Sequence, residues 1–193
     1  VWDTVGALGA PGLLGLLFNG RKYAYHDVGL NPLVKHAYHA MALDERRKPF
    51  VVNLFKRPPG WSGALEQAWF AGVHSDVGGS YRPDGLANEA LHWMVEKAEG
   101  LGLAFDDAYM APFLPCFNST LHDSSSWFYK LIGEVVRKVG RHGDDGECLH
   151  RSVIDRMAHA PSAYAPPNVP AASALPVVDT VRLPRGTPCD ALF

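Results

Sequence analysis

The fold is decided by the stretch QAWFAGVHSDVGGSY, which spans residues 67–81. Its first part, Ala68–Val73, is a short apolar run rich in aromatic residues, and such runs are typical of strands buried inside a parallel sheet. We expect the glycine-bearing segment His74–Asp84 to form the loop after this strand. The next segment, Gly85–Gly100, carries apolar residues at helical spacing, with Asp84 as the predicted N-cap and Gly100 as the C-terminal stop.

Strands and helices alternate along the rest of the chain, which predicts an α/β fold with a mostly parallel sheet and flanking helices. A helix is predicted over about 31–43, because apolar residues recur there at four-residue spacing behind an Asn-Pro start. A second amphipathic helix is predicted over about 125–139. The remaining predicted elements are the end of a strand at Val1-Trp2, a short helix over Pro11–Phe18, a short strand over Tyr23–Asp27 and an extended stretch over Phe50–Phe55.

Composition excludes several classes of protein. The 193 residues are 47% hydrophobic and 20% charged, a balance that lets one domain of ordinary size bury a core. The formal net charge of -2 gives no basic field, so no nucleic-acid partner is expected. No apolar run approaches the ~20 residues that cross a bilayer. The three cysteines are widely spaced and odd in number, so we predict free thiols in a reducing compartment.

The chain opens on Val1-Trp2, which has the pattern of the last residues of a strand, and we interpret the sequence as a fragment. Residues 1–160 are predicted to be the C-terminal part of a larger domain whose N-terminal strands are absent. Residues 161–193 are rich in Pro, Ala and Ser and are predicted to form an extended C-terminal segment.

Two residues at predicted strand ends could share a catalytic role. His74 directly follows the buried strand, and ligands of open α/β sheets bind outside the carboxyl ends of the strands. An imidazole there can take a proton from a nucleophile and return it to a leaving group. Asp3 follows the strand end at Val1-Trp2, and an acid so placed could orient the histidine. The alternatives are a histidine that only hydrogen-bonds its loop and an aspartate that only caps a turn.

A serine nucleophile is harder to find. The elbow of α/β-hydrolases reads Gly-x-Ser-x-Gly, and no such pentapeptide occurs in this sequence. The nearest serine, Ser62, follows Pro58-Pro59 instead of an apolar strand and lies after Asp3, so we reject it as the nucleophile. Asp76, two residues past His74, could support the histidine, bind a cation or, by default, accept hydrogen bonds from its own loop.

No metal or cofactor site is predicted. His36 and His39 would share a face of the helix expected over 31–43, but no acidic partner completes a metal site there. A metal-dependent hydrolase that uses His74 and Asp76 stays open as an alternative function.

Several motifs together resemble a bacterial and fungal α/β-hydrolase family catalogued as domain of unknown function 2235. The family includes phospholipase effectors of the bacterial type VI secretion system, which attack membrane lipids of rival cells. The resemblance covers nearly the whole chain in order. The motifs are VWDTVGALG (1–9), HAYHAMALDERRKPF (36–50), QAWFAGVHSDVGGSY (67–81), LANEALHWMVEKA (86–98), LHDS (121–124), HRSVIDRM (150–157) and YAPPNVP (164–170).

The resemblance implies an α/β-hydrolase-like fold in which Asp3 matches the acid and His74 the base of a catalytic triad. The family's Gly-Phe-Ser-Arg-Gly elbow precedes the VWDTVG motif, so the serine is expected upstream of this chain, which alone should be inactive. The implied activity is serine-dependent hydrolysis of lipid esters, with no cofactor. The alternative to an enzyme is a non-catalytic interaction domain that keeps part of the fold.

Partners and location also follow from the resemblance. It implies a lipid or ester substrate, contact with a membrane surface, and a secretion-system or immunity protein as partner. The protein is expected in the cytoplasm of the producing bacterium, with delivery to a target cell by the secretion system.

Overall fold

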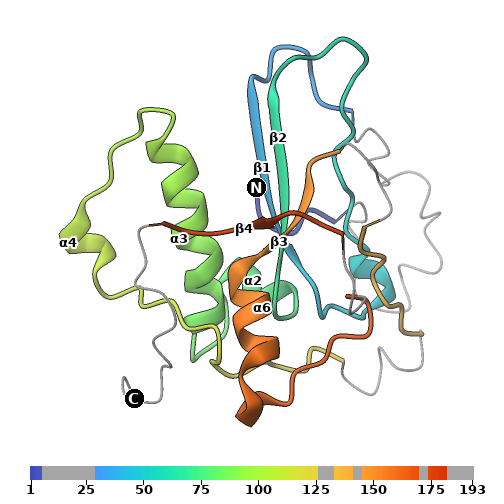
Figure 1. Cartoon of the computed structure of the whole chain (residues 1–193), viewed down its shortest axis with the longest axis vertical. Coiled ribbons are helices and arrows are strands. Elements are labelled where there is room, and N and C mark those ends of the chain that lie inside the picture. Colours follow the sequence, from blue (N-terminus) through green and yellow to red (C-terminus); the bar gives the residue numbers. More distant parts are fainter. Residues whose placement is uncertain (6–28, 126–132, 141–144, 170–173, 182–193) are drawn as a thin grey trace, which may run out of the picture.

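The computed structural model describes residues 1–5, 29–125, 133–140, 145–169 and 174–181. These residues form a four-stranded sheet in the order β1-β2-β3-β4, in which all neighbouring strands are parallel (Figure 1). The predicted α/β fold with a parallel sheet is therefore confirmed. The elements are β1 (His36–Ala42), η1 (Lys48–Phe50), β2 (Ala64–Phe70), α2 (His74–Gly78), α3 (Gly85–Glu99), α4 (Asp107–Met110), β3 (Glu147–His150), α6 (Arg151–Ala158), η2 (Ala160–Ser162) and β4 (Val177–Val178).

The first residues of the chain lie beside β1. Trp2 forms a parallel bridge with Ala40, whose N–H donates to the Val1 carbonyl at 3.0 Å. The Asp3 N–H donates in turn to the Ala40 carbonyl at 2.7 Å. The strand end predicted at Val1-Trp2 is thus present as a single bridge, and it brings Asp3 to the edge of the sheet where β1 ends.

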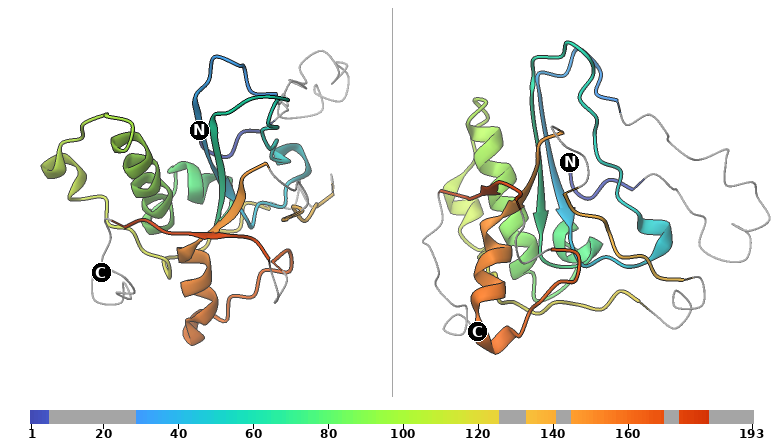
Figure 2. Two further views of the ribbon diagram at one scale, coloured as in Figure 1. Left: turned by 45° about the horizontal axis from the view of Figure 1, so that its top comes forward. Right: turned by 45° about the vertical axis from the view of Figure 1, so that its right-hand side comes forward.

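Strands β1 and β2 are buried on both faces. Ala40, Ala42, Ala68 and Phe70 belong to one core cluster, which includes Trp93 of α3. Small alanine side chains let the helix approach the sheet closely. The alternate positions of β1 and β2 belong to a second cluster on the other face, with residues of α6 and of the segment after η1. Figure 2 shows α3 along one side of β1 and β2 and the segment that carries η1 on the other side.

The helix predicted over 31–43 is wrong, because this segment contains β1. The apolar residues Ala37 and Met41 match helical spacing, but a strand buried on both faces also produces a run of buried residues without alternation. Asn31 caps no helix; its Oδ1 accepts the N–H of Leu33 in a local turn. His36 and His39 therefore lie on a strand, three positions apart, and point to opposite faces.

Two further predictions need correction. The predicted loop His74–Asp84 begins as the short helix α2. The helix predicted over 125–139 is not present in its described part, since residues 133–139 are not helical and Glu134 forms an antiparallel bridge with Arg47. The predicted elements at Pro11–Phe18 and Tyr23–Asp27 lie outside the described residues.

The strand and the helix of the central stretch are both confirmed. The strand predicted over Ala68–Val73 is β2, which begins four residues earlier and ends three earlier. The helix predicted from Gly85 is α3, which ends at Gly100 as expected, although the Asp84 side chain makes no capping hydrogen bond. The predicted free thiols are correct for Cys148, which is buried, and wrong for Cys116, which is disulfide-bonded.

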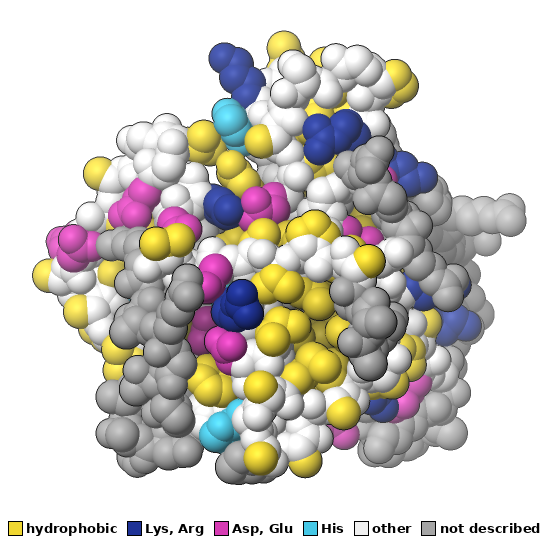
Figure 3. Space-filling view, viewed as in Figure 1, with side chains coloured by type: hydrophobic (Ala, Val, Ile, Leu, Met, Phe, Trp, Pro, Cys, Tyr) yellow, Lys and Arg dark blue, Asp and Glu magenta, His cyan; other side chains and the backbone are white. Residues whose placement is uncertain are grey.

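The C-terminal segment contacts the domain wherever it is described. Val169 belongs to the core cluster on the α6 face, and β4 pairs with β3. On the face shown in Figure 3, apolar side chains gather in the middle, where β4 and α6 lie in Figure 1, with charged side chains beside them.

Candidate active site

Asp3 is fixed by the backbone of the neighbouring strand. Its side chain is buried, and its backbone has φ +36°, a conformation that L-residues adopt rarely and at some energetic cost. Oδ1 accepts the N–H of Ala42, the last residue of β1, at 2.8 Å. The carboxylate therefore lies at the carboxyl end of the sheet, where the sequence predicted it.

His74 is the first residue of α2 and follows β2 after a tight turn. Gly72 makes this turn possible, because its φ of +118° is unfavourable for other residues and a Cβ would lie 2.5 Å from the Cβ of Asp76. The His74 ring packs edge-on against Phe50 and keeps 31% of its side chain exposed. Nδ1 lies 2.6 Å from Oδ2 of Asp3. The structure thus brings the two predicted site residues into hydrogen-bonding contact.

Three hydrogen bonds hold the Asp3 carboxylate besides its bond to the histidine. Arg137 donates from Nη1 to Oδ1 at 2.5 Å and from Nη2 to Oδ2 at 2.9 Å, and the backbone of Ala42 supplies the third bond. Burial is the largest influence and raises the pKa of Asp3, but the bonds from His74, Arg137 and Ala42 outweigh it and lower the pKa to about 2. Asp3 is therefore ionised at neutral pH, so Nδ1 of His74 carries the proton of the shared bond.

The sequence did not reveal Arg137. It belongs to the non-helical segment 133–140, is buried, and also donates to the carbonyls of Ala42 and Phe50. The signal in the sequence was an arginine inside an otherwise apolar stripe, since a buried guanidinium needs a carboxylate partner.

Glu45 is a second residue that sequence reasoning missed. It is buried and follows β1 by three residues. Its carboxylate accepts the backbone N–H and the guanidinium of Arg47, the hydroxyl of Ser124, and the backbone N–H of His74 at 3.2 Å. The bonds from Arg47 lower the pKa of Glu45 despite its burial. This carboxylate ties the start of α2 to the loop after β1.

Asp76 is placed against another histidine. Its Oδ1 lies 2.6 Å from Nδ1 of His122, and its Oδ2 accepts the backbone N–H groups of Val73 and His122. Only the bond from Val73 comes from its own loop, as the default role expects; the other two come from His122, 46 residues further along the chain. No contact joins the Asp76 carboxylate to the His74 ring among the described residues, so Asp76 can support His74 only through the backbone of α2.

The remaining candidates do not join this site. Ser62 is exposed and precedes β2, whereas His74 follows it, and a strand of this length separates them by about 20 Å. His39 is buried, accepts the Thr4 N–H at Nε2 and contacts Gln67 at Nδ1, and burial lowers its pKa to about 4. Within the described part of the chain, no three His, Cys, Asp or Glu residues are grouped so that they could hold a metal ion.

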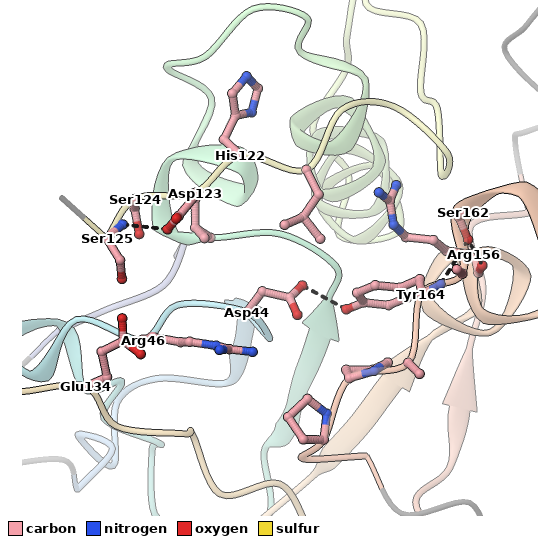
Figure 4. Close-up of a pocket in the computed structure, with 16 residues that line it drawn as sticks. Asp44, Arg46, His122, Asp123, Ser124, Ser125, Glu134, Arg156, Ser162 and Tyr164 are labelled. Carbon is pink, nitrogen blue, oxygen red and sulfur yellow. Dashed lines mark hydrogen bonds between the residues drawn. The ribbon is translucent and has the colours of Figure 1, made fainter. Parts of the chain in front are cut away.

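A cavity of about 880 Å³ lies beside His74, with Val73 in its wall (Figure 4). It opens at the carboxyl end of the sheet, because Asp44 follows β1 and Val73 follows β2. Segments 121–125 and 162–167 close it on the other sides. This is the position where ligands of open α/β sheets bind.

Comparison with known protein families gives a match over the first half of the chain. The family model described as the catalytic domain of Tle1-like phospholipase effectors of the type VI secretion system matches residues 1–97, half of the chain, and this range holds Asp3, His74 and Asp76. It is the family catalogued as domain of unknown function 2235. No curated protein and no solved structure matches. Over the described residues, no helix is long and apolar enough to span a bilayer.

Proposed function

The chain belongs to the Tle1-like family of type VI secretion phospholipase effector catalytic domains, and from this premise we propose that Asp3 and His74 are the acid and base of a serine-esterase triad. The observation that carries the proposal is the 2.6 Å contact between His74 Nδ1 and an Asp3 carboxylate that is ionised and held from three other sides. A triad requires this arrangement, because the acid fixes the imidazole tautomer with Nε2 free to accept a proton.

In the proposed reaction, His74 Nε2 takes the hydroxyl proton of a serine while the serine oxygen attacks the ester carbonyl carbon. The carbon–alkoxide bond then breaks, and the proton moves from Nε2 to the leaving alkoxide. Water repeats the cycle on the acyl-enzyme and releases a fatty acid. Asp3 stays ionised throughout and stabilises the imidazolium that forms.

We place the nucleophile outside these 193 residues. None of them forms a Gly-x-Ser-x-Gly elbow, and Ser62 lies at the wrong end of β2. The oxyanion hole of such enzymes uses the residue after the nucleophile, so we place it on the same segment as the nucleophile. The substrate is a membrane phospholipid, and contact with a membrane surface, delivery into a target cell and neutralisation by an immunity protein complete the proposal.

The test uses the longer protein that contains the elbow, with fatty-acid release from phospholipid vesicles as the measurement. His74→Ala should abolish release, with a loss on the order of 10⁴–10⁶, because the serine loses its general base. His36→Ala is the control, since His36 is exposed at the opposite end of β1 from the site and lines no part of the cavity. An active His74→Ala protein, or a longer protein that hydrolyses no ester, would refute the triad and favour an interaction domain.

A further inference from the structure

The cavity beside His74 is large enough for a small ligand. Its volume of about 880 Å³ falls within the range of roughly 300–1,000 Å³ that is usual for ligand pockets. It adjoins the proposed active site through Val73 and through Ser124, whose hydroxyl binds the same Glu45 carboxylate as the His74 N–H.

Arg156 is a buried cation in the wall of this cavity. It comes from α6, is only 7% exposed, and is anchored by Nη1, which donates to the carbonyls of Phe117 at 2.7 Å and Ser119 at 2.8 Å. Its Nε has no hydrogen-bond partner, and no carboxylate forms an ion pair with it among the described residues. A guanidinium buried in this way is costly unless an anion completes it.

Arg46 places a second guanidinium in the same cavity. The residue is exposed, and its side chain forms no ion pair in the described part of the chain. Asp44 lies between the two arginines, and both act on it electrostatically. Its carboxylate already accepts the Tyr164 hydroxyl and the Gly72 N–H, each at 2.7 Å, and burial raises its pKa. Among the lining residues in this part of the cavity, one engaged carboxylate therefore faces two guanidiniums, and Asp76 acts on Arg156 from outside the lining.

Two acidic residues line the cavity away from Arg156. Figure 4 shows Asp123 and Glu134 on one side and Arg156 on the other, with Arg46 reaching toward the middle. Oδ1 of Asp123 accepts the Ser125 N–H within its own loop. The lining is thus divided into a cationic and an anionic part. Such a division opposes a compact dianion and suits a ligand that has one negative and one positive end.

We propose that this cavity binds the headgroup of a zwitterionic glycerophospholipid. Arg46 and Arg156 hold the phosphodiester, and Asp123 and Glu134 hold the ammonium group. The inference rests on the proposed function, because it names the lipid class that is presented to His74. Arginine suits the phosphodiester, since its planar fork donates to two phosphate oxygens at once.

The test is a binding titration of the 193-residue chain, followed by amide chemical shifts in NMR. The probes are glycerophosphoethanolamine, glycerophosphoglycerol and inorganic phosphate. We expect saturable binding of glycerophosphoethanolamine, tighter than that of the other two, with shifts centred on 121–125 and 162–167. Arg46→Gln should weaken it about tenfold or more, the equivalent of one charge-assisted hydrogen bond, and Arg46 is exposed, so the fold should persist.

Two further variants make the titration decisive. Glu134→Gln should weaken the binding of glycerophosphoethanolamine and leave the affinity for glycerophosphoglycerol unchanged. Arg151→Gln is the control, because Arg151 lies on the same helix as Arg156 but outside the cavity, near Asp179. The proposal is overturned if no saturable binding occurs, if Arg46→Gln and Arg151→Gln bind equally, or if phosphate or glycerophosphoglycerol binds as tightly as glycerophosphoethanolamine.

The experiments distinguish failure of the headgroup proposal from failure of the proposed triad. Headgroup binding by this chain, with no ester hydrolysis by the longer protein, would refute the triad and keep the cavity assignment. Hydrolysis that depends on His74, without headgroup binding at the cavity, would do the reverse.

Discussion

Arg137 is the only arginine or lysine that contacts the Asp3 carboxylate among the described residues. Replacing it with glutamine removes this positive charge and leaves the hydrogen bond between Asp3 and His74 in place. Glutamine keeps a polar side chain of moderate length but no charge. The Asp3 carboxylate, whose side chain has no exposed surface, would then be a buried anion without a counter-ion. We therefore expect the variant to be less stable and its Asp3 to bind a proton more readily.

The size of the effect follows from the surroundings of Asp3. Leaving one partner of a buried ion pair uncompensated costs about 3–5 kcal/mol. One pKa unit corresponds to about 1.4 kcal/mol, so the same cost equals a rise of about two to four units. The pKa of Asp3, lowered to about 2 in the wild type, should then lie near 4–6 in the variant.

This shift predicts a pH dependence with a definite sign. In the wild type, the lowered pKa of Asp3 contributes stability above pH ~4 that is lost as the pH falls toward 2. In the variant, the raised pKa means that the ionised Asp3 carboxylate destabilises the folded state above pH ~4. The difference in unfolding free energy between the two proteins should therefore be largest, about 3–5 kcal/mol, at pH 7 and shrink as the pH falls.

Urea denaturation from pH 3 to 7 measures this difference, and a ¹³C titration of the Asp3 carboxyl measures its pKa directly. The double variant Asp3→Asn, Arg137→Gln is the control. It should lose less stability than the sum of the two single variants, because no buried charge remains. A loss that is independent of pH, together with additive single variants, would refute the account and leave Arg137 as a packing residue.

Three further predictions follow from the site and the core. Asp3→Asn in the longer protein should reduce kcat by about 10⁴, whereas Asp76→Asn should cost far less activity and lower the melting temperature; a loss at Asp76→Asn as large as at His74→Ala, with Asp3→Asn nearly normal and no change in melting, would show that the wrong acid was named. Burial raises the pKa of Glu89 to about 8, so the folded chain holds a proton that the unfolded chain releases near pH 4.5. Glu89→Gln should then be more stable than the wild type at pH 8 in urea denaturation, with the gap closing toward pH 4.5. Burial lowers the pKa of His39 to about 4, so its contribution to stability should be lost as the pH falls from 6.5 to 4, and a pH series on His39→Gln should show a flatter curve than the wild type.

The sequence was most informative where one pattern has one structural meaning. The apolar run that became β2 and the periodic segment that became α3 are both short-range signals, and both predictions were confirmed. The helix prediction for the segment that forms β1 was wrong, because a strand buried on both faces shows no alternation of apolar and polar residues. Helical spacing of three apolar residues then appeared by coincidence.

Site residues divide in a similar way. Asp3 and His74 follow strands, so the topology of a parallel sheet predicts that they meet. Glu45 and Arg137 carry no such pattern, because their roles depend on contacts between distant segments. The pairing of Asp76 with His122 spans 46 residues and was likewise beyond local reasoning.

The hydrogen bonds that position the Asp3 carboxylate, the acid of the proposed triad, come from residues far away in the sequence. Its partners Ala42, His74 and Arg137 lie 39, 71 and 134 residues further along the chain. Contacts at such separations form only after long loops have closed. If the chain is only partly folded, or if residues 133–140 detach from the site, Asp3 loses some of the hydrogen bonds that position its carboxylate against His74. Chemistry at this site is coupled to completion of the whole domain.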